Sequence, residues 1–223
     1  MNDPPKVSII VPAFNEAECI PLLAGELLPL VDKLAAEAIV VDDGSTDGTA
    51  EALCRHPGFR CVRIPHAGKT AALRQGVEAS LAPIVVTIDA DLQEDPADIP
   101  RLLEALGAGA NLAIACRSQR ADPWWSKRLP SAAYRLLIRL LFGFDFRDIN
   151  CGLRAAPRHV FLSTLPFEGA HRLVPLLVRL QGGTVREIAV SHRPRRRGHP
   201  KFQSPRRFLL AARDLFRVRL GRV

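Results

Sequence analysis

Two carboxylates at the end of a predicted strand are the side chains that could do chemistry most directly. The β-branched run at residues 84–88 predicts a buried strand, and Asp89 and Asp91 follow it at once. Alternate residues of an extended chain share a face, so both side chains can point the same way. Converging carboxylate oxygens suit a hard cation such as Mg²⁺ or Mn²⁺, with a phosphate as a further ligand. The alternative is a strand followed by a helix that Asp91 or Asp95 caps.

Short apolar strands alternate with helical patterns through the first half of the chain. The strands are expected over residues 7–11, 38–41, 61–64, 84–88 and 112–116, and the helical patterns over about 17–36, 46–55 and 68–80. Strands that are apolar throughout and separated by helices indicate a mostly parallel sheet with helices on both faces. The predicted fold class is therefore α/β.

Polar side chains follow each of these strands, at the point where the strand ends. They are Asn15 and Glu16, Asp42 and Asp43, His66 and Lys69, Asp89, Asp91 and Gln93, and Arg117. Each group by itself is compatible with a turn or a helix cap. The carboxyl ends of parallel strands, however, meet at one edge of the sheet, where open α/β folds bind their ligands. We therefore expect a cleft at this edge, lined by acids with basic groups nearby.

The second half of the chain predicts more helix and one basic loop. Helical patterns cover residues 127–142 and about 172–181, a turn-rich segment covers 144–154, and a strand covers 184–190. Residues 192–201 contain two prolines and a glycine and are expected to form a loop. Residues 205–220 predict an amphipathic helix. Its expected apolar face consists of Phe208, Leu209, Ala212, Leu215, Phe216 and Leu220, with Arg206, Arg213 and Arg217 towards the other side.

Composition limits the class of protein. With 223 residues, 48% of them hydrophobic and 24% charged, the chain can form a globular core. Its five cysteines are odd in number and lack C-x-x-C spacing, which argues against a disulfide framework or a zinc site and favours a reducing compartment. No secretory signal is visible, and no uncharged apolar run reaches the roughly 18–20 residues that span a bilayer. We expect a cytoplasmic protein.

Positive charge is concentrated at the C-terminal end. The net charge is +8, and residues 186–223 hold 12 Lys and Arg against 2 acids, so the preceding residues sum to −2. Such a block attracts nucleic acid, an acidic membrane surface or a phosphorylated substrate. Nucleic-acid binding would need stacking aromatic residues among the basic ones. Only Phe202, Phe208 and Phe216 are available, and the last two lie on the apolar stripe, so we do not expect a nucleic-acid partner.

The chain carries four motifs that together resemble family-2 glycosyltransferases of GT-A fold. They are Val-Pro-Ala-Phe-Asn-Glu (11–16), Val-Asp-Asp-Gly-Ser-Thr-Asp-Gly-Thr (41–49), Gly-Lys-Thr-Ala-Ala-Leu-Arg-Gln-Gly (68–76) and Asp-Ala-Asp-Leu-Gln-Glu-Asp-Pro (89–96). The segment Asp-Ile-Asn-Cys-Gly-Leu-Arg-Ala (148–155) and the basic run at 193–201 are similar to the dolichyl/polyprenyl-phosphate mannosyltransferase branch. The resemblance implies a GT-A domain over residues 1–202, followed by a basic amphipathic helix over 203–223.

The resemblance also implies roles for individual residues. The positions that hold the base and ribose of the donor are matched by Pro12, Phe14, Glu16, Val41 and Asp43. The positions that hold the metal and the diphosphate are matched by Asp89, Ala90, Asp91 and Gln93. Of these, Asp89, Asp91 and Gln93 would bind the metal. Arg117 would meet the sugar nucleotide or the acceptor phosphate, Arg195 and Lys201 the donor diphosphate, and Arg128 and Ser131 the lipid phosphate. The alternatives are a helix cap for Asp43 and a solvated basic loop for Arg195 and Lys201.

The implied reaction is an inverting transfer of a sugar, with mannose from GDP-mannose first, onto a polyprenyl or dolichyl monophosphate. A diphosphate leaves readily once Mg²⁺ or Mn²⁺ and basic side chains neutralise its charge. Asp91, Arg117 and Asp148 would be the catalytic residues. In relatives that act on hydroxyl acceptors a carboxylate takes a proton, but here Asp148 is assigned to positioning, because the acceptor is already an anion. The alternatives are a UDP-sugar donor, a non-lipid acceptor, or a nucleotidyltransferase, which would favour a Gly-rich loop near the N-terminus that this chain lacks.

Two departures from the family pattern bear on specificity. Relatives often have Gly-x-Ser-Lys where this chain has Gly-His-Pro-Lys at 198–201, and proline removes a donor N–H. Relatives also tend to carry an acid two residues before a His-Arg pair, whereas Glu168 is displaced by one position from that site. We assign no catalytic role to His66, His171, His192 or His199, because their spacing is not that of metal ligands.

A polyprenyl acceptor would require contact with a membrane. The helical segments at 127–142 and 205–220 can lie in the headgroup region, and the alternative is that both pack on the sheet. We expect peripheral association with the cytoplasmic face of an anionic membrane, directly or through a membrane-anchored partner protein.

Overall fold

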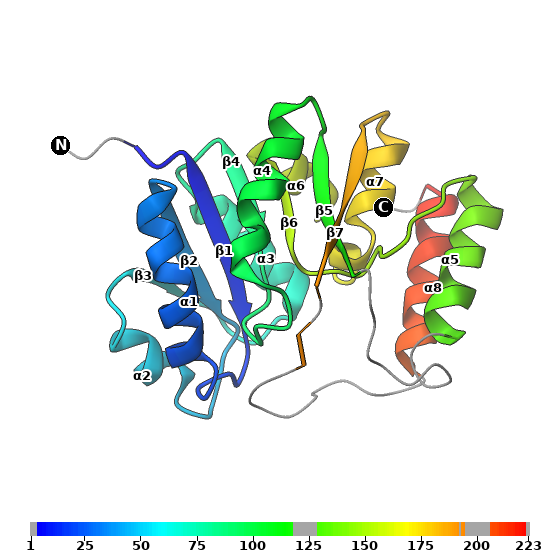
Figure 1. Cartoon of the computed structure of the whole chain (residues 1–223). Helices are drawn as coiled ribbons and strands as arrows, with labels where there is room; N and C mark the ends of the chain where they lie inside the picture. Colours follow the sequence, from blue (N-terminus) through cyan, green and yellow to red (C-terminus); the bar gives the residue numbers. More distant parts are fainter. Residues whose placement is uncertain (1–3, 118–128, 192, 195–205, 222–223) are drawn as a thin grey trace.

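A seven-stranded sheet forms the centre of the protein (Figure 1). The computed structural model describes residues 4–117, 129–191, 193–194 and 206–221. In these residues the strand order is β3-β2-β1-β4-β6-β5-β7, and only β6 runs antiparallel to its neighbours. The strands are β1 (Val7–Ala13), β2 (Ala36–Asp42), β3 (Phe59–Arg63), β4 (Ile84–Thr87), β5 (Leu112–Arg117), β6 (Arg154–Pro157) and β7 (Val185–Val190). The predicted α/β class with a mostly parallel sheet is confirmed.

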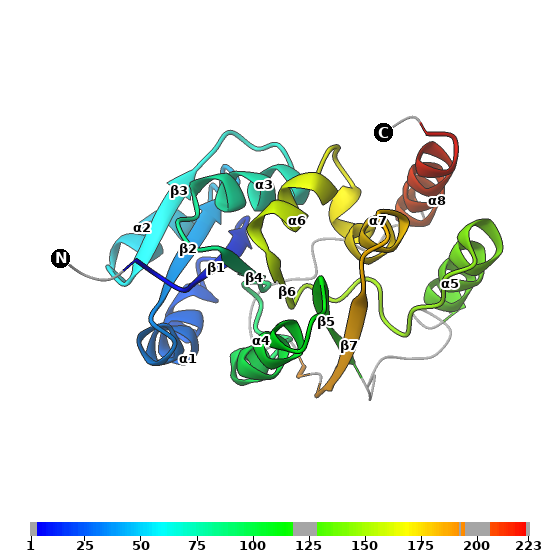
Figure 2. The same ribbon diagram turned by 90° about the horizontal axis from the view of Figure 1, so that it is seen from above.

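Helices cover both faces of the sheet (Figure 2). Helices α1 and α4 pack on one face, and α3, α6 and α7 pack on the other. Helices α5 and α8 lie side by side beyond α7, at the end of the sheet formed by β7. The helices are α1 (Ile20–Lys33), α2 (Thr49–Cys54), α3 (Lys69–Ala79), α4 (Ile99–Gly107), α5 (Leu129–Phe142), α6 (Arg158–Thr164), α7 (Val174–Leu180) and α8 (Arg206–Arg219), with 3-10 turns η1 (Pro96–Asp98) and η3 (Ala170–Arg172).

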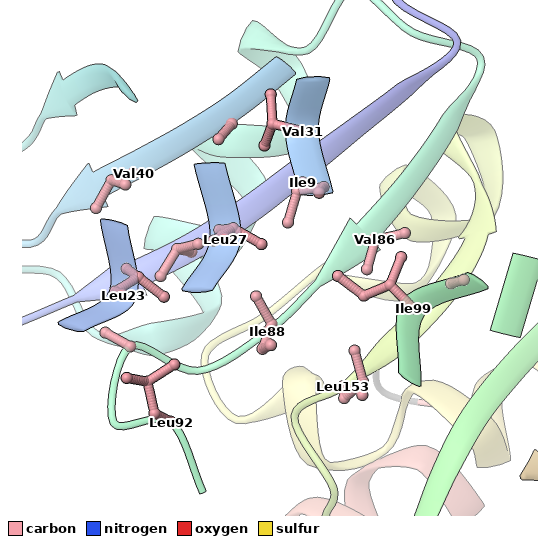
Figure 3. Close-up of a cluster of buried hydrophobic side chains, with 14 of the residues drawn as sticks. Ile9, Leu23, Leu27, Val31, Val40, Val86, Ile88, Leu92, Ile99 and Leu153 are labelled. Carbon is pink, nitrogen blue, oxygen red and sulfur yellow. The ribbon is translucent and has the colours of Figure 1, made fainter. Parts of the chain in front are cut away.

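The larger buried cluster fixes the chain just behind the Asp89–Asp91 pair. It lies between the sheet and helices α1 and α4, and includes Leu23, Leu27, Ile88 and Leu92 (Figure 3). Leu92 follows Asp91 directly and has a positive φ of 55°, which is uncommon for a residue other than glycine. Its side chain is only 1% exposed. Burial of Leu92 therefore holds the backbone of the turn that begins at Asp89.

Two local expectations differ from the structure, and one of the alternatives is observed. Strand β6 was not expected, because its four residues include a charged arginine and have no β-branched residue. Asp95 caps η1, with its side chain accepting a hydrogen bond from Ala97 N at 2.9 Å, so the capping alternative holds for this residue. The apolar face expected for α8 was wrong in part: Leu209, Phe216 and Leu220 are exposed, and the buried face consists of Ala211, Asp214, Leu215 and Val218. That face is rotated towards α5 and the core.

The chain contains no helix that could cross a bilayer in the part that the structure describes. The boundary expected between residues 202 and 203 lies outside the described residues, so the division into two domains stays a prediction. Within the described part, α8 packs against α5 and contributes Leu215 to a buried cluster with Leu173 and Leu176.

Replacement of Leu92 tests whether the turn depends on the core. We expect Leu92→Ala to lower the free energy of unfolding by about 2–5 kcal/mol, the usual range for a buried leucine. Leu81→Ala is the control, because Leu81 is 69% exposed and should change stability by less than about 0.5 kcal/mol. Urea unfolding followed by circular dichroism measures both. Equal effects of the two substitutions would contradict this account.

Candidate active site

The carboxylate of Asp89 is paired with Lys69. Asp89 follows β4, Lys69 is the first residue of α3, and the Lys69 Nζ lies 2.5 and 2.7 Å from the two carboxylate oxygens. Burial opposes ionisation of Asp89, but Lys69, Arg154 and Arg117 outweigh it and lower the pKa of the carboxyl. The sequence had placed Lys69 only among the polar groups at the strand ends. Its place in the Gly-Lys-Thr motif that opens α3 is the sequence feature that could have identified Lys69 as a site residue.

Asp91 and Gln93 lie on the turn that follows. Asp91 Oδ1 accepts a hydrogen bond from Gln93 N at 3.2 Å, and both side chains are half-buried. Among the described residues no group of three or more His, Cys, Asp or Glu side chains could hold a metal ion. The residues fit a cation that takes part of its ligand shell from a diphosphate and water, as Mg²⁺ commonly does. Ala90, expected beside them, is buried.

A third carboxylate lies beneath this turn. Glu94 is 3% exposed, its Oε1 accepts a hydrogen bond from Cys151 Sγ at 3.5 Å, and its Oε2 has no partner among the described residues. Burial, followed by the charges of Asp89 and Asp91, raises the pKa of Glu94 to about 7. The burial of Glu94 depends on tertiary packing, which a local motif does not report, so the sequence alone does not identify it as a site residue.

On the other side of the edge, Arg117 forms a two-point ion pair with Asp148. The Nε and Nη2 atoms of Arg117 lie 2.5 and 3.0 Å from the carboxylate oxygens, and Asp148 is 2% exposed. Burial opposes the charge on Arg117, but the hydrogen bond and charge of Asp148 outweigh it and raise the pKa of the guanidinium. Since its charge is already matched, Asp148 suits positioning better than proton abstraction.

The ends of β1 and β2 bring together the residues expected to hold the nucleoside. Pro12 and Val41 are register partners. Asp43 is buried, and its carboxylate accepts hydrogen bonds from Ala67 N at 2.8 Å and Gly68 N at 3.0 Å, so it holds the turn before α3. The ring of Phe14 stacks on the ring of His66, with centroids 4.2 Å apart.

Other residues of this edge have structural contacts of their own. Glu16 is buried, and its backbone N donates to Thr49 Oγ1 at 2.9 Å. His66 Nδ1 lies 2.9 Å from Asp43 Oδ2, and half of its side chain is exposed. His66 was expected at this polar edge of the sheet, without a catalytic role. The stacking of His66 on the partly buried ring of Phe14 can only be recognised once β1 and β3 are placed in one sheet.

The displaced acid Glu168 has a structural partner at the start of α3. Its carboxyl group lies so close to Gly68 that a Cβ there would come within 2.9 Å of it. His171 Nδ1 lies 2.7 Å from Thr70 Oγ1, which supports a hydrogen-bonding rather than a catalytic role for this histidine. The segment that departs from the family pattern thus contacts the helix that supplies Lys69.

Some expected site residues cannot be located. Arg128, Arg195 and Lys201 lie outside the described residues, and Ser131 lies within α5 but its side chain is not described. Their roles stay predictions. The structure brings together Asp89, Asp91, Gln93, Arg117 and Asp148 at the carboxyl ends of β4 and β5, and Pro12, Phe14, Glu16, Val41 and Asp43 at the ends of β1 and β2.

Curated relatives share about a third of their residues with this chain. An undecaprenyl-phosphate 4-deoxy-4-formamido-L-arabinose transferase of Sodalis glossinidius is 33% identical over 205 residues, which cover 88% of this chain and 63% of that protein. The protein of the same name from Pseudomonas aeruginosa is 33% identical over 208 residues, covering 90% and 61%. The chain therefore spans less than two thirds of the length of these relatives.

Solved structures with the same arrangement include glucosyl-3-phosphoglycerate synthase from Mycobacterium tuberculosis. The complex of that enzyme with Mn²⁺, UDP and glucosyl-3-phosphoglycerate has a TM-score of 0.77 and 26% identity, and the match covers 97% of this chain and 80% of that one. The complex with Mg²⁺ and UDP has a TM-score of 0.72. The expected GT-A fold is confirmed.

The family model for glycosyl transferase family 2 matches residues 8–163, a span that begins at the second residue of β1 and includes strands β2 to β6. It contains both the Asp89–Gln93 turn and the Arg117–Asp148 ion pair described above. The chain therefore belongs to glycosyl transferase family 2.

Proposed function

We propose that this glycosyltransferase moves a sugar from a sugar nucleotide to a polyprenyl monophosphate, with inversion at the anomeric carbon. The observation that carries the proposal is the sheet edge itself. It holds the carboxylates of the Asp89–Gln93 turn on one side and the Arg117–Asp148 ion pair on the other. The names of the curated relatives, which transfer a sugar to undecaprenyl phosphate, support the acceptor class.

The donor is the finer part of the proposal. The motif resemblance favours GDP-mannose, whereas the curated relatives are named for a formamido-arabinose and the solved neighbours bind UDP. We therefore place a UDP-sugar first and GDP-mannose second. Incubation of the protein with undecaprenyl phosphate, Mn²⁺ or Mg²⁺ and a panel of UDP- and GDP-sugars distinguishes them by the product formed.

In this reaction the side chains of the site would bind the metal, neutralise the charge of the diphosphate and orient the acceptor phosphate. Asp91 and Gln93 would hold Mg²⁺ or Mn²⁺, which when bound offsets the charge of the leaving diphosphate. The ammonium of Lys69, held by Asp89, adds positive charge at the same place. Arg117 would orient the acceptor phosphate, whose oxygen attacks the anomeric carbon while the bond to the diphosphate breaks. The acceptor is already ionised, so no side chain has to remove a proton.

Removal of the Asp91 charge tests the metal assignment. We expect Asp91→Asn to lower kcat/KM by at least about 100-fold, because the diphosphate loses electrostatic stabilisation as it leaves. Asp98→Asn is the control, since Asp98 pairs with Arg101 on the surface of α4 and not with the site. Initial rates and the thermal unfolding midpoint measure the two effects. Full activity of Asp91→Asn would overturn the assignment.

The Arg117–Asp148 pair should act as one unit. We expect Arg117→Lys and Asp148→Asn each to lower kcat/KM by about 10–100-fold, because either change releases the other side chain from its two-point contact. The kcat/KM of the double variant should be close to that of the less active single variant, as for residues that share one interaction. A double-mutant cycle on kcat/KM measures the coupling. Losses that multiply would show that the two residues act independently.

We also propose peripheral membrane association through an exposed surface of α5 and α8. Its apolar residues are Leu136 and Leu140 on α5 and Leu209, Phe216 and Leu220 on α8, all exposed. Exposed arginines flank them at Arg135, Arg139 and Arg219. Apolar side chains bordered by arginines suit the headgroup region of an anionic bilayer. All five cysteines are free, which supports placement on the reducing, cytoplasmic side.

Flotation with liposomes that contain anionic lipid tests this surface. We expect binding at low salt and release at high salt, and loss of binding for Leu140→Asp combined with Phe216→Asp. Leu81→Asp is the control, because Leu81 is equally exposed but lies between α3 and β4. Absence of binding by the wild-type protein at low salt would overturn direct association and favour a membrane-anchored partner protein.

A further inference from the structure

Arg193 joins three parts of the chain that lie far apart in the sequence. It follows β7 by three residues, and its Nη1 lies 2.6 Å from Glu26 Oε2 on α1. Its Nη2 pairs with Asp95 Oδ2, and its backbone N donates to Gln93 O at 3.0 Å. Arg193 is the first residue of the basic run at 193–201, but none of the roles proposed above is assigned to it. One residue thus connects the end of β7, helix α1 and the turn that carries Asp91.

The turn that Arg193 contacts is also held by Asp95 and Leu92. The other oxygen of Asp95 accepts the hydrogen bond from Ala97 N that begins η1. Within the turn, Leu92 is buried in the core below (Figure 3). The segment from Asp91 to Asp95 is therefore anchored from inside by Leu92 and from outside by Arg193.

Charge explains why an arginine suits this position. Glu26 and Asp95 bring two carboxylates to one guanidinium. Asp95 also lies close in sequence to the carboxylates of Asp91 and Glu94. A planar guanidinium can bond two carboxylates at once, whereas an ammonium lacks this forked geometry. About a quarter of each of the three side chains is exposed, so solvent screens part of the attraction. The ion pairs of Arg193 should therefore affect the conformation of the turn more than the free energy of unfolding.

We propose that Arg193 is a positioning residue that holds the Asp91–Asp95 turn in its metal-binding shape. It acts through the backbone of Gln93 and the side chain of Asp95, and its guanidinium is committed to two carboxylates rather than to a phosphate. The inference rests on the proposed function, because it assumes that Asp91 and Gln93 bind a divalent cation. It extends that function by naming a residue that touches neither the metal nor the donor.

Arg193→Met is the main test, with Mn²⁺ binding measured by electron paramagnetic resonance in the presence of UDP. We expect Mn²⁺ affinity and kcat/KM both to fall by about 10–100-fold, the usual effect of removing support behind a metal ligand. Arg193→Lys should recover part of the affinity. Arg101→Met is the matched control, because Arg101 forms an ion pair with Asp98 at 2.7 Å and does not contact the turn. It should leave Mn²⁺ affinity unchanged.

Two conservative substitutions keep the test open if Arg193→Met does not fold. Asp95→Asn retains a capping side chain for η1 but loses the ion pair, and Glu26→Gln loses the other one. Each should weaken Mn²⁺ binding less than Arg193→Met does. If these variants and Arg193→Met lower the thermal unfolding midpoint but leave Mn²⁺ affinity unchanged, Arg193 has only a structural role. That result overturns the positioning role of Arg193 and leaves the proposed function intact. A wild-type protein that binds neither Mn²⁺ nor UDP would overturn the proposed function as well.

Discussion

The ion pair between Lys69 and Asp89 joins the start of α3 to the end of β4, at the edge where a sheet covered on both faces offers its polar groups. Helices cover both faces of the sheet, so polar side chains gather at this edge, and an ionised carboxylate that is withdrawn from water there is stabilised by a positive partner. Asp148 obtains one from Arg117, and Asp95 from Arg193. The described acids of the site are therefore largely paired with basic side chains, and a cation and a diphosphate would add opposite charges together.

Strand β6 supplies the support behind this balance. The segment before it passes so close to Asp89 that a Cβ at position 152 would lie 2.7 Å from the Asp89 carboxyl carbon, so any larger residue there would displace the carboxylate that pairs with Lys69. Two residues later, Arg154 is fully buried and donates to the carbonyl oxygens of His171 and Ile149. Its charge also favours the ionised form of Asp89. One antiparallel strand thus joins the Asp89 end of β4 to the segment that contacts α3.

The same segment connects the site with the peripheral helix α8. Gly169 lies so close to Asp214 of α8 that a Cβ there would come within 2.4 Å of a carboxylate oxygen, and Arg217 stacks over Phe167. These contacts turn the polar Asp214 inwards and leave Phe216 exposed. An amphipathic helix with a buried acid and exposed apolar residues meets two different surroundings, the protein on one side and the proposed membrane surface on the other.

The sequence by itself determined the parallel sheet and its polar edge, because apolar strands and the residues that end them are local patterns. The Asp89–Asp91 pair and the family motifs could be recognised in the same way. Tertiary structure alone decided the pairing of Lys69 with Asp89, the burial of Glu94, the position of β6 and the contact of Arg193 with Glu26. The first of these partners lie 20 residues apart and the last 167. Periodicity reports which residues of one element share a face, but not which element comes to cover that face.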